Sequence, residues 1–175
     1  MKKAIFGFVA VAAALGVQVA LSRLLPAVSE RLDLLLVVVV YYGVSGAQMT
    51  AMLIGASAGL LQDVWFGVLL GRTGVRKVMT GYLVGAVGSR LALEGPLAHA
   101  PALALATIAD HATGVVAGEL IGAPLADPFS WMLLQKALVN AVVGTACFAL
   151  VGRLTRERER RRTARARRPA LRGAR

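Results

Sequence analysis

The chain has 175 residues, of which 57% are hydrophobic and only 6% aromatic, and it carries a formal net charge of +11. A water-soluble domain needs a polar surface, and residues 4–152 contain too few polar side chains to supply one, which excludes an ordinary soluble protein. Eleven arginines against two glutamates lie in residues 153–175, and the rest of the chain has nine basic against seven acidic residues. The net charge is therefore a property of the tail and indicates no nucleic-acid-binding domain.

The N-terminus has the outline of a signal peptide, with two lysines at positions 2 and 3 followed by an apolar run over residues 4–21. This run of 18 residues is longer than a usual signal core, and no small-x-small cleavage site follows it. We therefore predict a retained first membrane helix over residues 4–24, ended by Pro26.

Residues 34–70 contain a single formal charge, Asp63. One helix of this length would measure about 55 Å, whereas the hydrocarbon core of a bilayer is about 30 Å thick. The segment must fold back on itself, and the sequence Gly43-Val44-Ser45-Gly46 supplies a turn. We expect two short helices, over residues 32–44 and 47–64.

Three more helices are predicted beyond the glycine-rich link at residues 67–74. The first, over residues 75–93, contains several charged side chains and is expected to have one lipid face and one protein face. The second, over residues 101–123, has Pro101 in its first turn, where a missing N–H costs nothing. The third covers residues 131–152.

Both termini are basic, so the positive-inside rule places both in the cytoplasm and requires an even number of spans. We therefore expect an all-α polytopic membrane domain with about six transmembrane helices over residues 1–152. Residues 153–175 form a cytoplasmic tail, expected to be a disordered topology anchor, with attraction to anionic lipids or an acidic partner as the alternative. Arg72, Arg76 and Lys77 oppose this topology, because it leaves them on the outer side.

The chain has only two histidines, His99 and His111, and its sequence contains no fingerprint of a known enzyme class or nucleotide site. The sequence evidence for catalysis is therefore weak. Asp110 and His111 are neighbours near the middle of a predicted membrane helix, so they point about 100° apart. An unpaired charge at that depth is costly, which makes Asp110 a functional candidate. We favour a polar contact between helices, with Asn140 as the partner.

Two further charges, Glu119 and Lys136, lie at similar depths near the outer ends of the last two predicted helices. They could form an ion pair that serves packing. The sequence thus predicts no catalytic residues, metal site or cofactor.

Small residues recur at helical spacing on three predicted helices. The glycines in question are Gly55 and Gly59, Gly81 and Gly85, and Gly114, Gly118 and Gly122. Glycines four residues apart share a helix face and let two helix backbones approach closely. Packing within this chain is the favoured explanation for any one pair. With three such faces, we expect at least one, with Gly114, Gly118 and Gly122 first, to dock a partner's transmembrane helix.

A distinctive motif follows the third predicted helix. Its residues are Gly59, Leu60, Leu61, Asp63, Gly67 and Gly71. An acid here ends an apolar helix and precedes an aromatic pair suited to the membrane interface. We predict that Asp63 caps the following turn or accepts hydrogen bonds from backbone N–H groups there.

The pattern G-L-L-x-D-x-x-x-G-x-x-x-G resembles the hallmark of the MreD family of rod shape-determining proteins. Asp33-Leu34-Leu35-Leu36 leading to Tyr41 is similar to the second helix of that family, and Gly81-Tyr82-Leu83-Val84-Gly85 to its fourth. The resemblance covers most of residues 1–152 and leaves the Arg-rich tail outside.

The resemblance implies a non-enzymatic scaffold of the cell-elongation machinery in the bacterial cytoplasmic membrane. Its expected partners are the bitopic protein MreC and, through it, the peptidoglycan polymerase RodA and its penicillin-binding transpeptidase, with MreB filaments beneath. The tail would add a contact to filaments or lipids. The implied fold is similar to that of the substrate-binding subunits of energy-coupling-factor vitamin transporters.

Two rival functions remain open. A vitamin-binding transporter subunit predicts a polar pocket that opens outward and is lined by Arg72, Arg76, Asp110 and Glu119. An intramembrane enzyme would use Asp110 with His111 and a second acid or a metal. A glycine-faced groove open to lipid would favour the scaffold instead.

Overall fold

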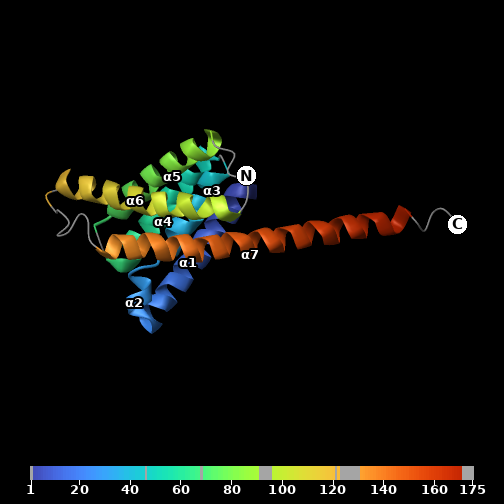
Figure 1. Ribbon diagram of the computed structural model, residues 1–175, viewed down its shortest axis with the longest axis horizontal. Helices are drawn as coiled ribbons and strands as arrows, with labels where there is room; N and C mark the ends of the chain where they lie inside the picture. The colour runs from blue at the N-terminus through green and yellow to red at the C-terminus, as the bar shows by residue number, and fades with distance from the viewer. Residues whose placement is uncertain are drawn as a thin grey trace.

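The computed structural model describes residues 2–45, 47–67, 69–90, 96–120, 122 and 131–170, and every regular element within these residues is a helix (Figure 1). The helices are α1 (Lys2–Leu24), α2 (Pro26–Ser29), α3 (Leu34–Val44), α4 (Gln48–Phe66), α5 (Arg72–Arg90), α6 (Pro96–Leu120) and α7 (Trp131–Ala170). The predicted division of residues 34–70 into two helices is confirmed.

In the described part of the chain, four helices are long and apolar enough to cross a membrane. Their candidate spans are Phe6–Leu24, Gln48–Phe66, His99–Leu120 and Trp131–Thr155. Two further helices, α3 and α5, do not meet this criterion, each for its own reason. The 11 residues of α3 measure only about 16 Å, and α5 contains charged residues in its first and last turns and at Arg76 and Lys77.

The short helix α3 lies at the centre of the bundle, in contact with α1, α4, α5, α6 and α7. Its buried side chains contribute to two apolar clusters. Leu36, Val37 and Val40 pack with residues of α6 and α7, while Leu35 and Val39 pack with residues of α1 and α4. A helix that is apolar on every side has to be buried on every side, and this explains the uninterrupted run of Leu and Val in α3.

Helices α4 and α5 pack backbone against backbone. The glycines at this contact are Gly55 and Gly59 on α4 and Gly81 and Gly85 on α5. A Cβ atom on Gly81 would lie 2.7 Å from the carbonyl oxygen of Ala51, and one on Gly85 would lie 2.7 Å from Cα of Gln48. Gly81 and Gly85 are therefore used inside the chain, as we favoured for any one pair, and the alternative that this pair docks a partner's helix is not supported.

The expected glycine face on α6 is not continuous. Gly114 lies against α5, where an added Cβ would fall 2.8 Å from Nε of Arg76. Gly118 is buried. Gly122 follows the last helical residue, Leu120, and has a left-handed φ of 69°. Its role is conformational, because such a φ costs a glycine little, so the three glycines do not form one docking surface.

The N-terminal boundaries of α5 and α6 differ from the prediction. Helix α6 begins at Pro96, so Pro101 lies inside the helix. Pro96 occupies the first helical position, where proline is favourable, and takes the role that we assigned to Pro101. Helix α5 begins at Arg72, earlier than residue 75, and the predicted end at residues 91–93 lies outside the described residues.

Helix α7 does not end near Gly152 but continues to Ala170. The backbone of residues 153–170 is thus helical where we expected disorder, and residues 171–175 lie outside the described part. Arg, Glu and Ala favour helix, and neither Gly nor Pro occurs between positions 153 and 168.

The arrangement of the ends is clear in Figure 1. The N-terminus lies at the end of the bundle where α7 emerges, and the charged half of α7 projects beyond it. The short helix α2 and the first turn of α7 lie at the opposite end. The chain therefore enters and leaves the bundle on the same side.

Candidate functional site

The side chain of Asp63, at the end of α4, is fully buried and caps the N-terminus of α5. It accepts hydrogen bonds from the backbone N–H groups of Gly71 at 2.8 Å, Thr73 at 3.1 Å and Gly74 at 3.4 Å. The first N–H groups of a helix have no partner within the helix, and the helix dipole favours a negative charge there. The predicted hydrogen bonding of Asp63 is confirmed.

The glycines of the motif shape the corner between α4 and α5. Gly67 ends α4 with a left-handed φ of 65°, and its N–H donates to the carbonyl of Asp63. Gly71 has a φ of 93°, which turns the chain into α5. Leu60 and Leu61 are each 42% exposed and face away from the core. The motif thus builds a rigid corner whose acid is saturated by backbone donors.

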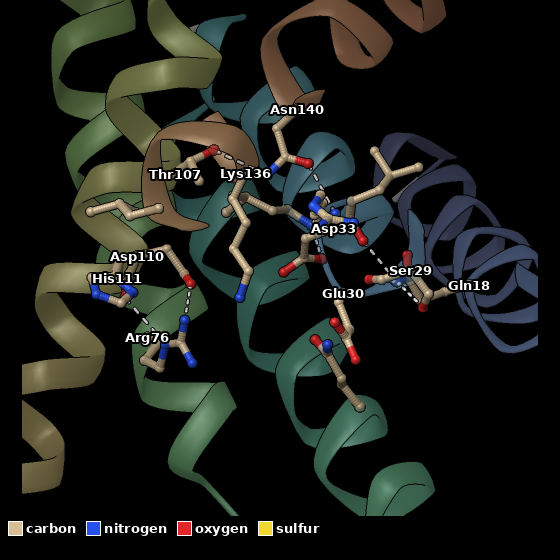
Figure 2. Close-up of a pocket in the computed structure, with 15 residues that line it drawn as sticks. Gln18, Ser29, Glu30, Asp33, Arg76, Thr107, Asp110, His111, Lys136 and Asn140 are labelled. Carbon is tan, nitrogen blue, oxygen red and sulfur yellow. Dashed lines mark hydrogen bonds and ion pairs between the residues drawn. The ribbon is translucent and has the colours of Figure 1, made fainter. Parts of the chain in front are cut away.

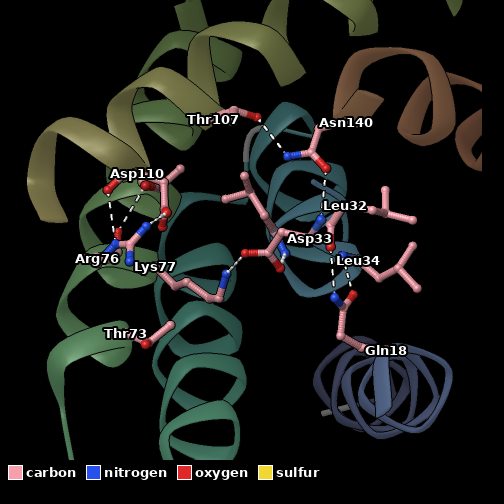
Figure 3. Close-up of polar contacts among 12 residues, drawn as sticks. Gln18, Leu32, Asp33, Leu34, Thr73, Arg76, Lys77, Thr107, Asp110 and Asn140 are labelled. Atoms are coloured by element: carbon pink, nitrogen blue, oxygen red, sulfur yellow. Dashed lines mark hydrogen bonds and ion pairs between the residues drawn. The ribbon is translucent and has the colours of Figure 1, made fainter. Parts of the chain in front are cut away.

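A second acid, Asp33, organises the link before α3 (Figure 3). Its Oδ1 caps α3 by accepting from the N–H of Leu36 at 2.9 Å, and its Oδ2 pairs with the fully buried ammonium of Lys77. Burial alone would raise the pKa of Asp33, but the charge and hydrogen bond of Lys77, with the hydrogen bond from Leu36, hold it below the ordinary value.

Amide side chains satisfy the backbone of the same link. Gln18 of α1 donates to the carbonyl of Leu32 at 2.8 Å and accepts from the N–H of Leu34 at 3.1 Å. Asn140 of α7 accepts from the N–H of Asp33 at 2.9 Å and donates to Oγ1 of Thr107 at 3.1 Å. Non-helical backbone inside a membrane protein needs such partners, because lipid supplies none.

Asp110 of α6 pairs with Arg76 of α5, whose Nε also donates to the carbonyl of Asp110 at 3.1 Å. The expected partner Asn140 is occupied elsewhere, so the proposed contact between Asp110 and Asn140 is replaced by an ion pair. His111 lies beside Asp110 at the same pocket (Figure 2).

The suggested pair of Glu119 and Lys136 does not form. Glu119 is exposed in the last turn of α6, whereas Lys136 lines a pocket, and neither makes an ion pair in the described part of the chain. Each charge faces a different environment, so their similar depth along the bundle does not bring them together.

These polar side chains surround a pocket of about 180 Å³ at the end of the bundle opposite the termini. Figure 2 shows that residues of α1, the link before α3, α5, α6 and α7 point toward it. Its polar lining includes Glu30, Arg31, Gln62, Asp110, Lys136 and Asn140. The pocket is the polar centre of an otherwise apolar bundle.

The pocket agrees only in part with the rival functions. It includes Arg76 and Asp110, as the transporter alternative predicts, but its lining contains neither Arg72 nor Glu119. Among the described residues, no group of three or more His, Cys, Asp or Glu side chains could hold a metal ion. His99 lies apart, in edge-on contact with Phe148 at 5.1 Å between ring centroids.

Two grooves on the outer surface are lined only by apolar residues and glycine. The groove between α4 and α5 has a volume of about 290 Å³ and is lined by Ala56, Leu60, Gly71, Gly74, Val75, Val78 and Met79. The groove between α5 and α6 has a volume of about 100 Å³ and is lined by Leu83, Val84, Val87, Ala102, Leu105, Ala106 and Ala109. Both could accept an apolar helix or a lipid chain.

Sequence reasoning did not identify Gln18 or Lys77 as polar anchors of the fold, and it cited Asp33 only for the resemblance. One signal was available, since Gln18 is a lone polar residue inside an apolar helix. Such a residue in a membrane segment usually faces a polar partner.

A family model described as rod shape-determining protein MreD matches residues 4–109, more than half of the chain. The match contains the corner between α4 and α5 and the pair of Asp33 and Lys77, and it ends one residue before Asp110. No curated protein and no solved structure matches the chain.

Proposed function

The chain belongs to the MreD family of rod shape-determining membrane proteins, and from this we propose that it is a non-enzymatic scaffold that binds MreC in the cell-elongation complex. Through MreC it would act on the peptidoglycan polymerase RodA and its transpeptidase partner. The corner at Asp63 supports this proposal, because the acid of the family-like motif holds α4 and α5 against each other through backbone hydrogen bonds.

We place the protein in the bacterial cytoplasmic membrane with both termini in the cytoplasm and six passes of the chain through the bundle, of which the short helix α3 is the central one and is surrounded by the others. Arg72, Arg76 and Lys77 oppose this orientation as outer positive charges. Arg76 is neutralised by Asp110 and Lys77 by Asp33, which leaves Arg72 as the one opposing charge of the three. Paired charges inside the bundle contribute little to a rule that concerns basic residues in loops.

The groove between α4 and α5 is the surface that best fits the transmembrane helix of MreC. Ala56, Gly71 and Gly74 are small residues in its lining, and they allow a second helix backbone to approach closely. Leu60 and Met79 flank them with exposed apolar side chains. This groove is the observation that supports the binding mode.

A pull-down from native membranes in mild detergent, followed by mass spectrometry, tests the proposal. Ala56→Phe should fill the groove and reduce the recovery of MreC and the synthase. Val142→Phe is the matched control, because Val142 is 63% exposed on α7, outside the groove. Unchanged recovery with Ala56→Phe would reject the groove, and absence of MreC from the wild-type sample would reject the scaffold.

The presence of a polar pocket is the observation that keeps one alternative open, a vitamin-binding subunit of an energy-coupling-factor transporter, although the small size of the pocket counts against it. Its volume of about 180 Å³ is below the roughly 300–1,000 Å³ of sites for drug-sized ligands. Recovery of an ATPase module with a bound vitamin, and no MreC, would establish this alternative.

A further inference from the structure

Several polar groups at the pocket have no partner in the described part of the chain. Oδ1 of Asp110 and Oε1 of Gln62 are buried acceptors without a donor. The Asp110 side chain is only 6% exposed. Lys136 makes neither a hydrogen bond nor an ion pair within the same part of the chain. Buried polar groups in folded proteins are nearly always paired with protein or with water, so the two buried acceptors call for donors from water or from a bound molecule.

The charged side chains at the pocket indicate whether the bound molecule is an anion or a cation. The carboxylates of Asp33 and Asp110 are already neutralised by lysine and arginine. Glu30, Arg31 and Lys136 remain without an ion pair among the described residues, which leaves an excess of one positive charge. An anionic group fits this balance.

Arg31 and Lys136 line the same pocket. Arg31 donates from Nε to Oε1 of Gln135 at 2.9 Å and from Nη1 to the carbonyl of Ala27 at 2.6 Å, and it makes no ion pair among the described residues. Figure 2 shows the Lys136 side chain pointing into the space between Asp110 and Glu30. Cations that approach from two elements suit a phosphate, whose oxygens point in several directions and accept charge-assisted hydrogen bonds.

The inner part of the pocket requires hydrogen-bond donors. Oδ1 of Asp110 and Oε1 of Gln62 can only accept, and both are closed to solvent, so hydroxyl groups of a ligand that parts the lining side chains would satisfy both. The volume of about 180 Å³ equals that of about six water molecules in the liquid. A polyol of a few carbon atoms with one phosphate is of this size.

We propose that the pocket binds a phosphate-bearing polyol with the chemistry of a glycerophosphate. Its phosphate would lie on Lys136 and Arg31, and its hydroxyls would donate to Asp110 and Gln62. Two sources share this chemistry, the headgroup of phosphatidylglycerol and a free glycerol phosphate. The proposal is independent of MreC binding.

The test uses the purified full chain, with thermal unfolding and native mass spectrometry as readouts. Glycerol 3-phosphate, glycerol and inorganic phosphate are added to protein in detergent. In parallel, nanodiscs of phosphatidylglycerol are compared with nanodiscs of phosphatidylcholine. We expect stabilisation by the glycerophosphate group and a mass adduct of the same ligand. Response to the lipid alone assigns the source to the membrane, and response to glycerol 3-phosphate assigns it to the solute.

Lys136→Gln should weaken binding about tenfold or more, the equivalent of one charge-assisted hydrogen bond. Arg72→Gln is the matched control, because it removes one positive charge outside the pocket lining. Gln62→Leu should remove the preference for glycerol 3-phosphate over inorganic phosphate. No stabilisation in either arm, or equal binding by Lys136→Gln and wild type, would overturn the proposal. Loss of MreC in the pull-down, by contrast, would leave it standing.

Discussion

Gly59 of α4 touches Gly74 of α5, and a Cβ atom on Gly59 would fall 2.5 Å from Cα of Gly74. The reverse is not true, because a Cβ atom on Gly74 would meet only Leu60, at an ordinary distance of 3.6 Å. The contact is therefore asymmetric although both residues are glycine.

This asymmetry gives the first prediction. Gly59→Ala should destabilise the protein by about 1–3 kcal/mol, the usual cost of overpacking a rigid contact. Gly74→Ala should be neutral or slightly stabilising, because Ala favours helix over Gly. Thermal unfolding in detergent, followed by tryptophan fluorescence, compares the two. Equal effects of the two substitutions would show that α4 and α5 are farther apart than described.

Removal of the Asp63 carboxylate should release the N-terminus of α5. Asp63→Ala leaves the N–H groups of Gly71 and Thr73 buried without an acceptor, and we expect a loss of about 2 kcal/mol. Hydrogen exchange should accelerate at Gly71, Thr73 and Gly74 and stay unchanged in α7. Asp63→Asn keeps one acceptor oxygen and should have a smaller effect. Protection that survives in Asp63→Ala would argue against the cap.

The pair of Asp33 and Lys77 should respond unequally to the loss of either partner. The Lys77 side chain is fully buried, whereas that of Asp33 is 27% exposed. Asp33→Asn leaves a buried ammonium without its counter-ion and should cost about 3 kcal/mol or more. Lys77→Met leaves a carboxylate that reaches solvent and still caps α3, so it should cost less. The unfolding midpoints of the two variants test this prediction. A larger loss of stability in Lys77→Met than in Asp33→Asn would contradict the described burial of the pair.

The helical extension of α7 should be visible in circular dichroism. The full chain and a variant ending at Gly152 should differ by about 18 helical residues, the number from Arg153 to Ala170. The unfolding midpoint should be the same in both, because the extension projects beyond the bundle (Figure 1). If the full chain and the shortened variant contain the same number of helical residues, the tail is disordered, as the sequence suggested.

Local features were the most predictable from the sequence. The turn near Gly43, the cap by Asp63 and the start of α7 follow from residues close together in the chain. The motif that carries the family resemblance also consists of residues close together in the chain, and it forms the corner between α4 and α5. Each of these predictions required only knowledge of helix ends and glycine.

Long-range partners were not predictable in this way. Asp110 meets Arg76 because α5 and α6 pack side by side, and Lys77 reaches Asp33 across 44 positions of the chain. The spacing of Gly81 and Gly85 shows that a helix packs on that face, but it does not show whether the helix belongs to this chain or to a partner. Only the arrangement of the helices distinguishes these cases.

The length of α7 affects the reach of its positive charge. The candidate membrane span of this helix ends at Thr155, and the helix continues for 15 residues to Ala170. A helix that leaves the bilayer along its axis places Ala170 about 22 Å from the membrane surface. This distance exceeds two Debye lengths at physiological salt, each about 8 Å. At such a distance salt would screen the distal arginines from the lipid headgroups, and we expect their charge to act on molecules that diffuse in the aqueous phase.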